Sequence, residues 1–192
     1  MKTSKFLLIP AIALLSFSAC KSKKATPIQK ETGAVEISVP FSSKEFRSDE
    51  NFFRAKQSGK SPDQATAKKI AYQNARAEMA ANINATVKRV TDQYTNQRTV
   101  GNKQEFENKF EELSREVVNL EMGNVKEIGE KIFREQDGSY TYWIAIEAGT
   151  KSVFDKIENK ISSDAKLKLD YDKMKFQQTF DAEMKKLAEE GK

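Results

Sequence analysis

The sequence contains no histidine and only one cysteine, Cys20, among its 192 residues. Histidine supplies the base of many serine and cysteine hydrolases and is a frequent ligand of catalytic zinc, so its absence excludes those designs. We therefore predict no catalytic residues, no metal site and no cofactor, and we do not expect an enzyme.

A large excess of charge of one sign is also missing. Lys and Arg number 33 and Asp and Glu number 28, and the net charge of +5 includes Lys2 and Lys5 near the start of the chain. Acidic and basic residues alternate along the predicted helices, whereas a nucleic-acid-binding protein gathers its basic residues on one surface. We expect no nucleic-acid partner. The length favours one domain with a hydrophobic core.

Met1 to Ala19 has the pattern of a targeting segment. Lys2 and Lys5 form its basic start, and the apolar run over 6–15 is too short to span a bilayer. The segment ends in Phe-Ser-Ala before Cys20, which resembles the bacterial lipoprotein signal, whose cysteine is lipidated and becomes the mature N-terminus. We predict a signal peptide over 1–19 and an acylated Cys20 that binds membrane lipid. An ordinary signal peptide with a stray cysteine is the alternative.

Residues 20–33 contain little that a core could bury and predict a flexible tether after the lipidated cysteine. Three lysines follow the cysteine closely, at Lys21, Lys23 and Lys24, where some gram-negative lineages carry acidic residues that mark surface export. We therefore expect a lipid-anchored protein of the outer membrane that faces the periplasm. The alternative role for these lysines is contact with anionic lipid headgroups.

A domain is predicted over 34–148, with one long helix from Ser61 to about Tyr94 as its central element. The sequence Ser-Pro-Asp-Gln at the helix start is a capping box. The helix has one mostly small apolar face and one mostly large one: Ala67, Ile70, Ala77, Ala81 and Ala85, against Tyr72, Met79, Ile83, Val87, Val90 and Tyr94. Apolar residues on two sides indicate a sandwiched helix, so we expect the alanine face to pack closely on a sheet.

Two segments are predicted to supply that sheet. Alternating apolar residues over 34–39 indicate a half-buried strand. The following segment, 41–60, is predicted to be a long connection whose aromatic residues hold it to the core: Phe46, Phe52 and Phe53.

Residues 124–148 predict a β-hairpin that turns at Asp137-Gly138. Two cross-strand pairs follow from that turn: Phe133 with Tyr142, and Ile132 with Trp143. The core face is predicted to consist of Tyr142, Ile144 and Ile146. Gly129 indicates a bulge or the close approach of a helix.

Further helices are predicted on both sides of the hairpin. The first has an apolar face of Phe106, Phe110, Leu113 and Val117. In the C-terminal extension, 149–192, a third helix presents Val153, Phe154, Ile157 and Ile161. A fourth, capped by Ser162 or Ser163, runs to about Glu189 with Phe176, Phe180, Met184 and Leu187 as its main stripe. The predicted fold is therefore α+β: a small antiparallel sheet (one strand plus a β-hairpin), packed by a long alanine-rich helix, with a helical C-terminal tail.

A shorter stripe on the fourth helix consists of Leu167, Tyr171 and Met174. Two arrangements are open for it. Left exposed, it would bind a protein partner or a second copy of the chain. Packed on the preceding helix, it would instead complete a local helical hairpin. The hairpin tip around Tyr140, together with Trp143, is a further candidate recognition surface.

Charged residues that could form a site are interpreted as solvated surface. The neighbouring acids are Glu111 with Glu112, Asp155 with Glu158, and Asp170 with Asp172, and they lack the loop glycine and distal glutamate of a calcium hand. A hydrolase built on two such carboxylates is our third hypothesis. Three arginines, Arg54, Arg76 and Arg89, are expected to form ion pairs at the surface instead of an anion site.

One further set of residues forms a recognisable pattern: Phe53-Arg54-Ala55, Gly59-Lys60-Ser61, Ala71, Ala75, Arg76, Ala77, Met79, Ala80, Gly138, Tyr140 and Trp143. On these residues, the chain over about 35–148 resembles the lipoprotein-20 family of small bacterial outer-membrane lipoproteins. The resemblance implies a membrane-tethered α+β domain with no established enzymatic activity and no agreed catalytic residues. We therefore expect an envelope lipoprotein that works as a non-catalytic binding or structural module. The alternative is an envelope-assembly accessory or small-ligand-binding module that uses the aromatic loop and the hairpin.

Overall fold

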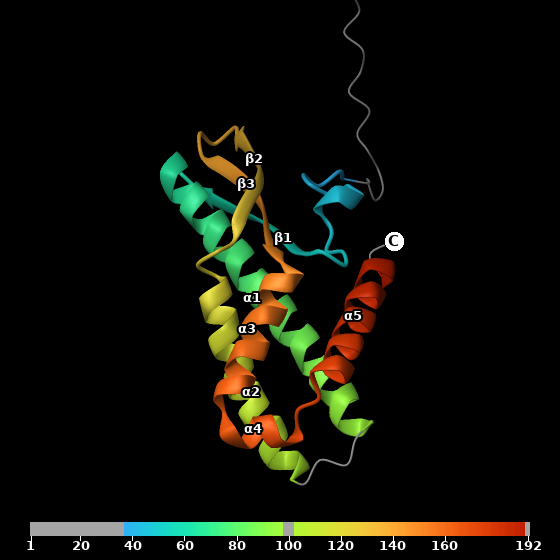
Figure 1. Ribbon diagram of the computed structural model, residues 1–192. Coiled ribbons are helices and arrows are strands. Elements are labelled where there is room, and N and C mark those ends of the chain that lie inside the picture. Colours follow the sequence, from blue (N-terminus) through green and yellow to red (C-terminus); the bar gives the residue numbers. More distant parts are fainter. Residues whose placement is uncertain (1–36, 98–101, 191–192) are drawn as a thin grey trace, which may run out of the picture. The chain divides into compact units, whose positions relative to one another are not determined.

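The computed structural model describes residues 37–97 and 102–190 (Figure 1). The chain divides into two units, 1–37 and 38–192, and every helix and strand described below belongs to the second. These elements are, in order, η1 (Lys44–Phe46), β1 (Phe52–Ser61), α1 (Gln64–Asn96), α2 (Lys103–Glu121), β2 (Lys126–Arg134), β3 (Tyr140–Gly149), α3 (Thr150–Ser163), α4 (Ala165–Asp170) and α5 (Lys173–Glu190).

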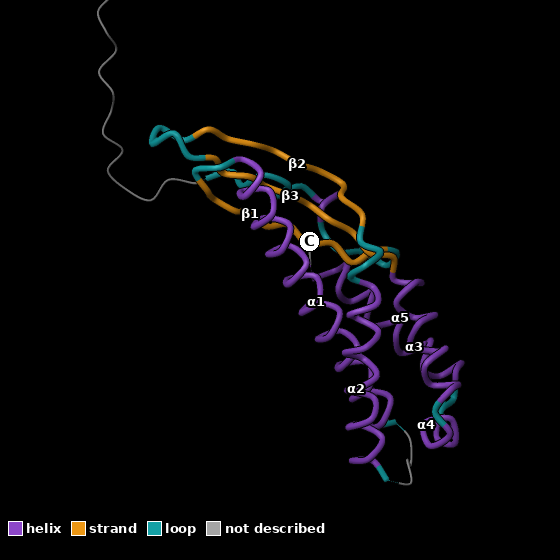
Figure 2. Tube along the Cα trace, turned by 90° about the vertical axis from the view of Figure 1, so that its left-hand side faces the viewer, coloured by secondary structure: helices purple, strands orange, loops and turns teal. Residues whose placement is uncertain are grey.

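The predicted α+β class is confirmed. One strand and a β-hairpin form a three-stranded antiparallel sheet in the order β1-β3-β2, and the long helix α1 packs on one of its faces (Figure 2). Helices α3 to α5 make up the helical C-terminal tail.

The single strand comes from a different segment than predicted. It is β1, which lies in the stretch that we expected to be a connection except for its last residue, Ser61. Phe53 and Ala55 point into the core, and the polar Arg54 lies between them. The second half of β1, residues 57–61, contains no large apolar residue, so the sequence shows no apolar alternation there. Of the predicted strand over 34–39, residues 37–39 are not in a strand and the side chain of Ile37 is 79% exposed. Residues 34–36 lie outside the described residues.

Helix α1 buries one continuous face instead of two. Its first half places Ala67, Ala71 and Ala75 in the core, and its second half continues the same face with Met79, Ile83, Val87, Val90 and Tyr94. The small side chains are needed because β1 runs very close to the helix. A Cβ added to Gly59 would lie 2.4 Å from the backbone nitrogen of Ala71. The large predicted face is confirmed, apart from the half-buried Tyr72.

The prediction that a second, alanine face packs on the sheet is wrong. Ala77, Ala81 and Ala85 are all exposed, and only Ala67 of that face is fully buried. The helix start also differs, because Asp63 is the N-cap. Its side chain accepts a hydrogen bond from the Thr66 N–H at 2.7 Å, while Ser61 is the last residue of β1.

The hairpin register differs by one residue from the prediction. Ile132 pairs with Tyr142, Phe133 with Thr141 and Lys131 with Trp143. The cause is the loop, which is longer than the predicted two-residue turn. The N–H of Gly138 donates to the Glu135 carbonyl at 3.0 Å, and Gly138 adopts a φ of 81°, the left-handed conformation of a type I turn closed by a glycine bulge.

The predicted core face of the hairpin is confirmed, since Tyr142, Ile144 and Ile146 are buried. The bulge at Gly129 is also confirmed by a shift of register between residues 127 and 129. What approaches Gly129 is an aromatic ring, not a helix. A Cβ at this glycine would lie 2.7 Å from Cε1 of Phe41.

The second half of α1 continues past the sheet and forms a helical core with α2, α3 and α5 (Figure 2). The predicted apolar faces of α2 and α3 are both buried. A cluster of aromatic rings joins these four helices: Tyr94 of α1, Phe106 and Phe110 of α2, Phe154 of α3, and Phe176 of α5.

The predicted fourth helix is two helices, α4 and α5, separated at residues 171–172. Asp164, and not Ser162 or Ser163, begins α4, because its Oδ1 accepts the Leu167 N–H at 3.0 Å. Asp172 begins α5 in the same way by accepting the Lys175 N–H at 3.1 Å. An aspartate carboxylate is a strong N-cap acceptor, so each aspartate starts a new helix. The main stripe of α5 is buried as predicted, except for the half-buried Leu187.

Candidate binding groove

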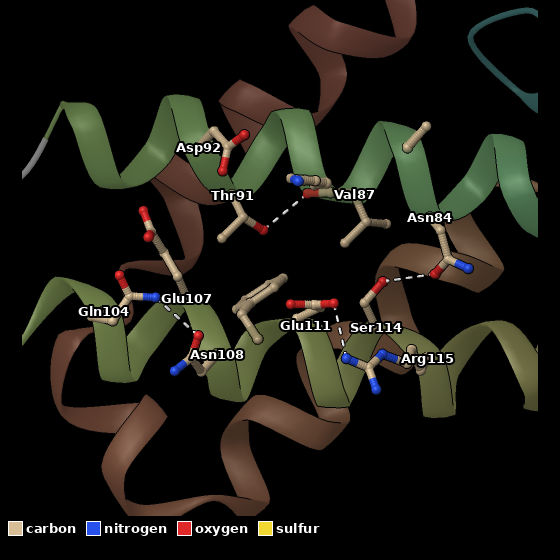
Figure 3. Close-up of a pocket in the computed structure, with 13 residues that line it drawn as sticks. Asn84, Val87, Thr91, Asp92, Gln104, Glu107, Asn108, Glu111, Ser114 and Arg115 are labelled. Carbon is tan, nitrogen blue, oxygen red and sulfur yellow. Dashed lines mark hydrogen bonds and ion pairs between the residues drawn. The ribbon is translucent and has the colours of Figure 1, made fainter.

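A cavity of about 480 Å³ lies between α1 and α2, on the side of these helices that α3 to α5 leave open (Figure 3). The floor of the cavity includes Val87 and Phe110, both from the helical core. The other lining residues are mostly polar: Asn84, Ala85, Lys88, Thr91, Asp92, Gln104, Glu107, Asn108, Glu111, Ser114 and Arg115. We call this the α1–α2 groove.

Two buried hydroxyls lie in the wall of the groove. Thr91 is 5% exposed and Ser114 is 6% exposed. The Thr91 hydroxyl donates to the Val87 carbonyl at 2.9 Å, and the Ser114 hydroxyl donates to Oδ1 of Asn84 at 3.2 Å. Asn84 therefore accepts through its oxygen, which leaves its amide NH2 available to donate to a ligand.

Charged and amide side chains form the rim. Arg115 binds Glu111 at 2.8 Å, and Gln104 donates to Asn108 at 3.0 Å (Figure 3). Lys88 and Asp92 stand on the α1 side of the groove. The rim therefore offers both signs of charge together with amides that donate and accept, which suits a polar partner with its own donors and acceptors.

The predicted partner surface on the C-terminal helices is not one surface. Leu167 is 2% exposed and belongs to the core, so it takes the packed arrangement and not the exposed one of the two that the sequence left open. Tyr171 is partly buried, with its ring 5.6 Å from that of Phe176. Met174 is 70% exposed. The break between α4 and α5 causes the separation, because the three residues no longer follow one helical face.

Tyr171 has an unusual hydroxyl. Among the described residues nothing forms a hydrogen bond with it, although the oxygen is buried. Burial raises the pKa of Tyr171 above the ordinary value for tyrosine. The neighbouring Tyr94 is satisfied, since its hydroxyl accepts the Asp172 N–H at 2.7 Å.

Tyr140 and Trp143 lie on opposite faces of the sheet. Tyr140 shares the face of Tyr142 and packs partly on the core. Trp143 is half-buried on the other face, between Ser58 of β1 and Lys131 of β2. They are therefore not a joint recognition surface at the hairpin tip.

The segment before β1 covers part of this outer face. The ring of Phe41 packs on Gly129 and lies 4.7 Å from the ring of Phe46, and its carbonyl accepts a hydrogen bond from Lys56 Nζ at 2.7 Å. Phe53, by contrast, points into the core. The aromatics of this segment hold it to the sheet, as we predicted.

Most of the charged candidates are engaged with one another. Arg54 binds Asp49 at 2.5 Å and Glu147 at 3.3 Å, and Arg89 binds Glu183, so the predicted ion pairs are confirmed for these two arginines. Arg76 lies over the ring of Tyr72 at 5.7 Å. Acids of the predicted pairs bind lysines or arginines: Glu111 with Arg115, Asp155 with Lys151, and Glu158 with Lys173. In the described part of the chain, no three potential metal ligands gather into a site.

A charged cluster joins the start of α1 to the sheet. The Tyr142 hydroxyl donates to Glu130, and Nζ of Lys68 binds the same carboxylate at 2.9 Å. These hydrogen bonds, that of Tyr142 first, lower the pKa of Glu130 to about 2, and the pKa of Lys68 is raised. Since all three side chains satisfy one another, the cluster fastens α1 to β2 and β3.

No protein-family model matches the chain, and comparison with curated proteins and with solved structures likewise gives no match. Within residues 37–97 and 102–190, no helix is both long and apolar enough to cross a membrane. Cys20 lies outside the described residues.

Sequence reasoning missed the α1–α2 groove. Its residues come from two helices and are ordinary polar residues of an amphipathic helix, without a motif. The one signal available was a small hydroxyl residue beside each apolar stripe, at Thr91 and Ser114. That signal is weak because such residues also occur in helices for no functional reason.

Proposed function

We propose that this protein is a lipid-anchored lipoprotein of the bacterial outer membrane that faces the periplasm and binds a partner without catalysing a reaction. The anchor is proposed from the sequence, where the only cysteine follows a basic and apolar segment. The resemblance to the lipoprotein-20 family supports the same proposal. The absence of histidine from the whole chain favours binding over catalysis.

The α1–α2 groove is the proposed binding site, and the observation that carries this is its lining. A groove of about 480 Å³ combines an apolar floor with two buried hydroxyls and an Asn84 amide that can donate, which is the mixed lining of a binding site. The groove lies between two helices, and small residues such as Ala85 and Ser114 allow close approach. We propose that it receives a polypeptide segment of a partner that carries both acidic and basic residues.

A substitution that fills the groove tests the proposal. Ala85 is exposed and lines the groove, so Ala85→Arg should block it while α1 stays folded. The matched control is Ala77→Arg, an exposed alanine of the same helix outside the groove. Partners would be captured on the lipidated full chain from solubilised membranes and quantified.

We expect Ala85→Arg to lose the captured partner and Ala77→Arg to retain it. Thermal unfolding of both variants checks that each is folded. Equal capture by the two variants would show that the groove is not the binding site.

A further inference from the structure

Strand β2 leaves one edge of the sheet open. In the order β1-β3-β2 it pairs with β3 on one side only, and among the described residues no strand pairs with its other side (Figure 2). Helix α1 packs beneath β1 and β3, and its Lys68 binds the side chains of Glu127 and Glu130 of β2. An unpaired strand edge carries free N–H and C=O groups that can pair with another strand.

The opposite edge, β1, is closed by side chains. The Ser48 hydroxyl bonds to both the N–H and the carbonyl of Arg54, at 2.9 and 3.2 Å. The Asn74 amide donates to the Ser58 carbonyl at 3.0 Å. Within the described residues, no comparable hydrogen bond reaches the backbone of β2 outside its ladder with β3. Side chains therefore bind backbone groups along β1, whereas among the described residues no side chain binds the backbone of β2.

The open edge also exposes apolar side chains. Ile132 is 43% exposed on the face that α1 covers elsewhere, and Phe133 is 45% exposed on the outer face. Charged residues protect many edge strands from pairing, and here Lys131 and Arg134 flank the two exposed apolar residues. The bulge at Gly129 limits the regular part of the strand to residues 129–134.

We propose that a second copy of the chain adds its own β2 to this edge, antiparallel and centred on Ile132. A twofold axis perpendicular to the sheet keeps each residue opposite one on the same face. In this register Ile132 faces its own copy, Glu130 faces Arg134, and Lys131 faces Phe133. Apolar meets apolar, opposite charges meet, and an ammonium lies beside an aromatic ring. The result is a continuous six-stranded sheet.

Other symmetric registers fit less well. Centring on Glu130 or Lys131 places like charges directly opposite each other, which destabilises a strand pair. Centring on Phe133 leaves only residues 132–134 of β2 paired within the strand. Self-pairing at Ile132 is therefore the register that the sequence of β2 favours.

A cysteine cross-link tests both the contact and its register. Ile132→Cys in the full chain should form a disulfide-linked dimer under mild oxidation, because the two cysteines would face each other. Arg134→Cys is the matched control. It lies on the same strand and face, but its copy would be about 13 Å away, four residues along the strand. The wild-type chain is a control for cross-links that form through Cys20. Leu120→Cys, at another exposed apolar position, measures the amount of dimer that forms by random collision.

Sedimentation of the wild-type chain in detergent micelles gives an independent measurement. We expect the protein mass to double with concentration, and we expect Ile132→Lys, which sets two lysines opposite each other, to shift it to the monomer. Circular dichroism checks that the variant is folded. A monomer at all concentrations, or equal cross-linking at positions 132 and 134, would overturn the proposal. Failure of the groove test would leave it unaffected, because the two surfaces share no residue.

Discussion

At the scale of single residues, two neighbouring tyrosines differ in one hydrogen bond. The Tyr171 hydroxyl is buried without a partner among the described residues, whereas the Tyr94 hydroxyl accepts the Asp172 N–H at 2.7 Å. A buried polar group without a partner loses its hydration and gains nothing in return, so its removal is neutral or stabilising.

We therefore expect Tyr171→Phe to leave the free energy of unfolding unchanged or to raise it by up to about 1 kcal/mol. Tyr94→Phe, the matched substitution, should lower it by about 1 kcal/mol because the Asp172 N–H loses its acceptor. Urea titrations of both variants measure the difference. A larger loss from Tyr171→Phe than from Tyr94→Phe would mean that the Tyr171 hydroxyl has a partner.

The hairpin loop supplies a prediction about pH. The Ser139 hydroxyl and N–H and the Lys60 ammonium bind Asp137 and lower its pKa to about 2, below the ordinary aspartate value of about 3.9. A carboxylate with a lowered pKa stabilises the fold above the unfolded-state pKa, and this contribution is lost as the pH falls through the folded-state pKa. The loss should therefore occur between about pH 4 and pH 2.

Carboxyl chemical shifts of Asp137 followed from pH 6 to pH 2 measure this titration directly. We expect its midpoint near pH 2, and we expect Lys60→Ala to raise the midpoint while the Ser139 hydrogen bonds keep it below the ordinary value. A midpoint of about 4 in the wild-type chain would show that the loop hydrogen bonds do not persist in solution.

At the scale of elements, the alanines of α1 fall into two groups, those that pack on the sheet and those that are exposed. Ala71 lies against Gly59 with no room between them, and Ala77 is exposed six residues further on. Ala71→Leu should overpack this contact and lower the free energy of unfolding by roughly 1–3 kcal/mol. Ala77→Leu should change it by less than about 0.5 kcal/mol. Thermal denaturation of the two variants measures the difference. Equal losses of stability from Ala71→Leu and Ala77→Leu would contradict the structure.

Helices α4 and α5 show how a local cap overrides a continuous apolar pattern. The spacing of apolar residues from Leu167 to Leu187 allows one helix, but Asp172 caps a new helix and changes the direction of the chain. Leu167 therefore packs in the core while Met174 is exposed. A stripe predicted on one helix is thus divided between two.

At the scale of the whole molecule, the proposed lipid anchor determines where the protein works. Cys20→Ser should prevent acylation, so the protein should move from the detergent-rich phase to the aqueous phase in a phase-partition experiment. Metabolic labelling with a radioactive fatty acid measures acylation directly. Ser22→Cys in the Cys20→Ser background is the control, and it tests whether a cysteine two residues away can replace Cys20. Label that persists in Cys20→Ser would refute the anchor.

The sequence by itself determined the parts of the fold that depend on local pattern. The α+β class, the hairpin with Tyr142, Ile144 and Ile146 inward, and the buried faces of α2 and α3 all follow from residue spacing. Such patterns are reliable where one face of an element is buried, because the period of the apolar residues then matches the period of the backbone.

Only the tertiary structure decided which partners these elements meet. The close contact of Gly59 with α1 made one alanine series core and left the other exposed, and an extra loop residue shifted the hairpin register by one. The α1–α2 groove and the open edge of β2 also depend on neighbours distant in the chain. The spacing of apolar residues reflects only the period of the helix or strand that contains them. A groove or a free strand edge depends instead on which surfaces the other elements leave uncovered.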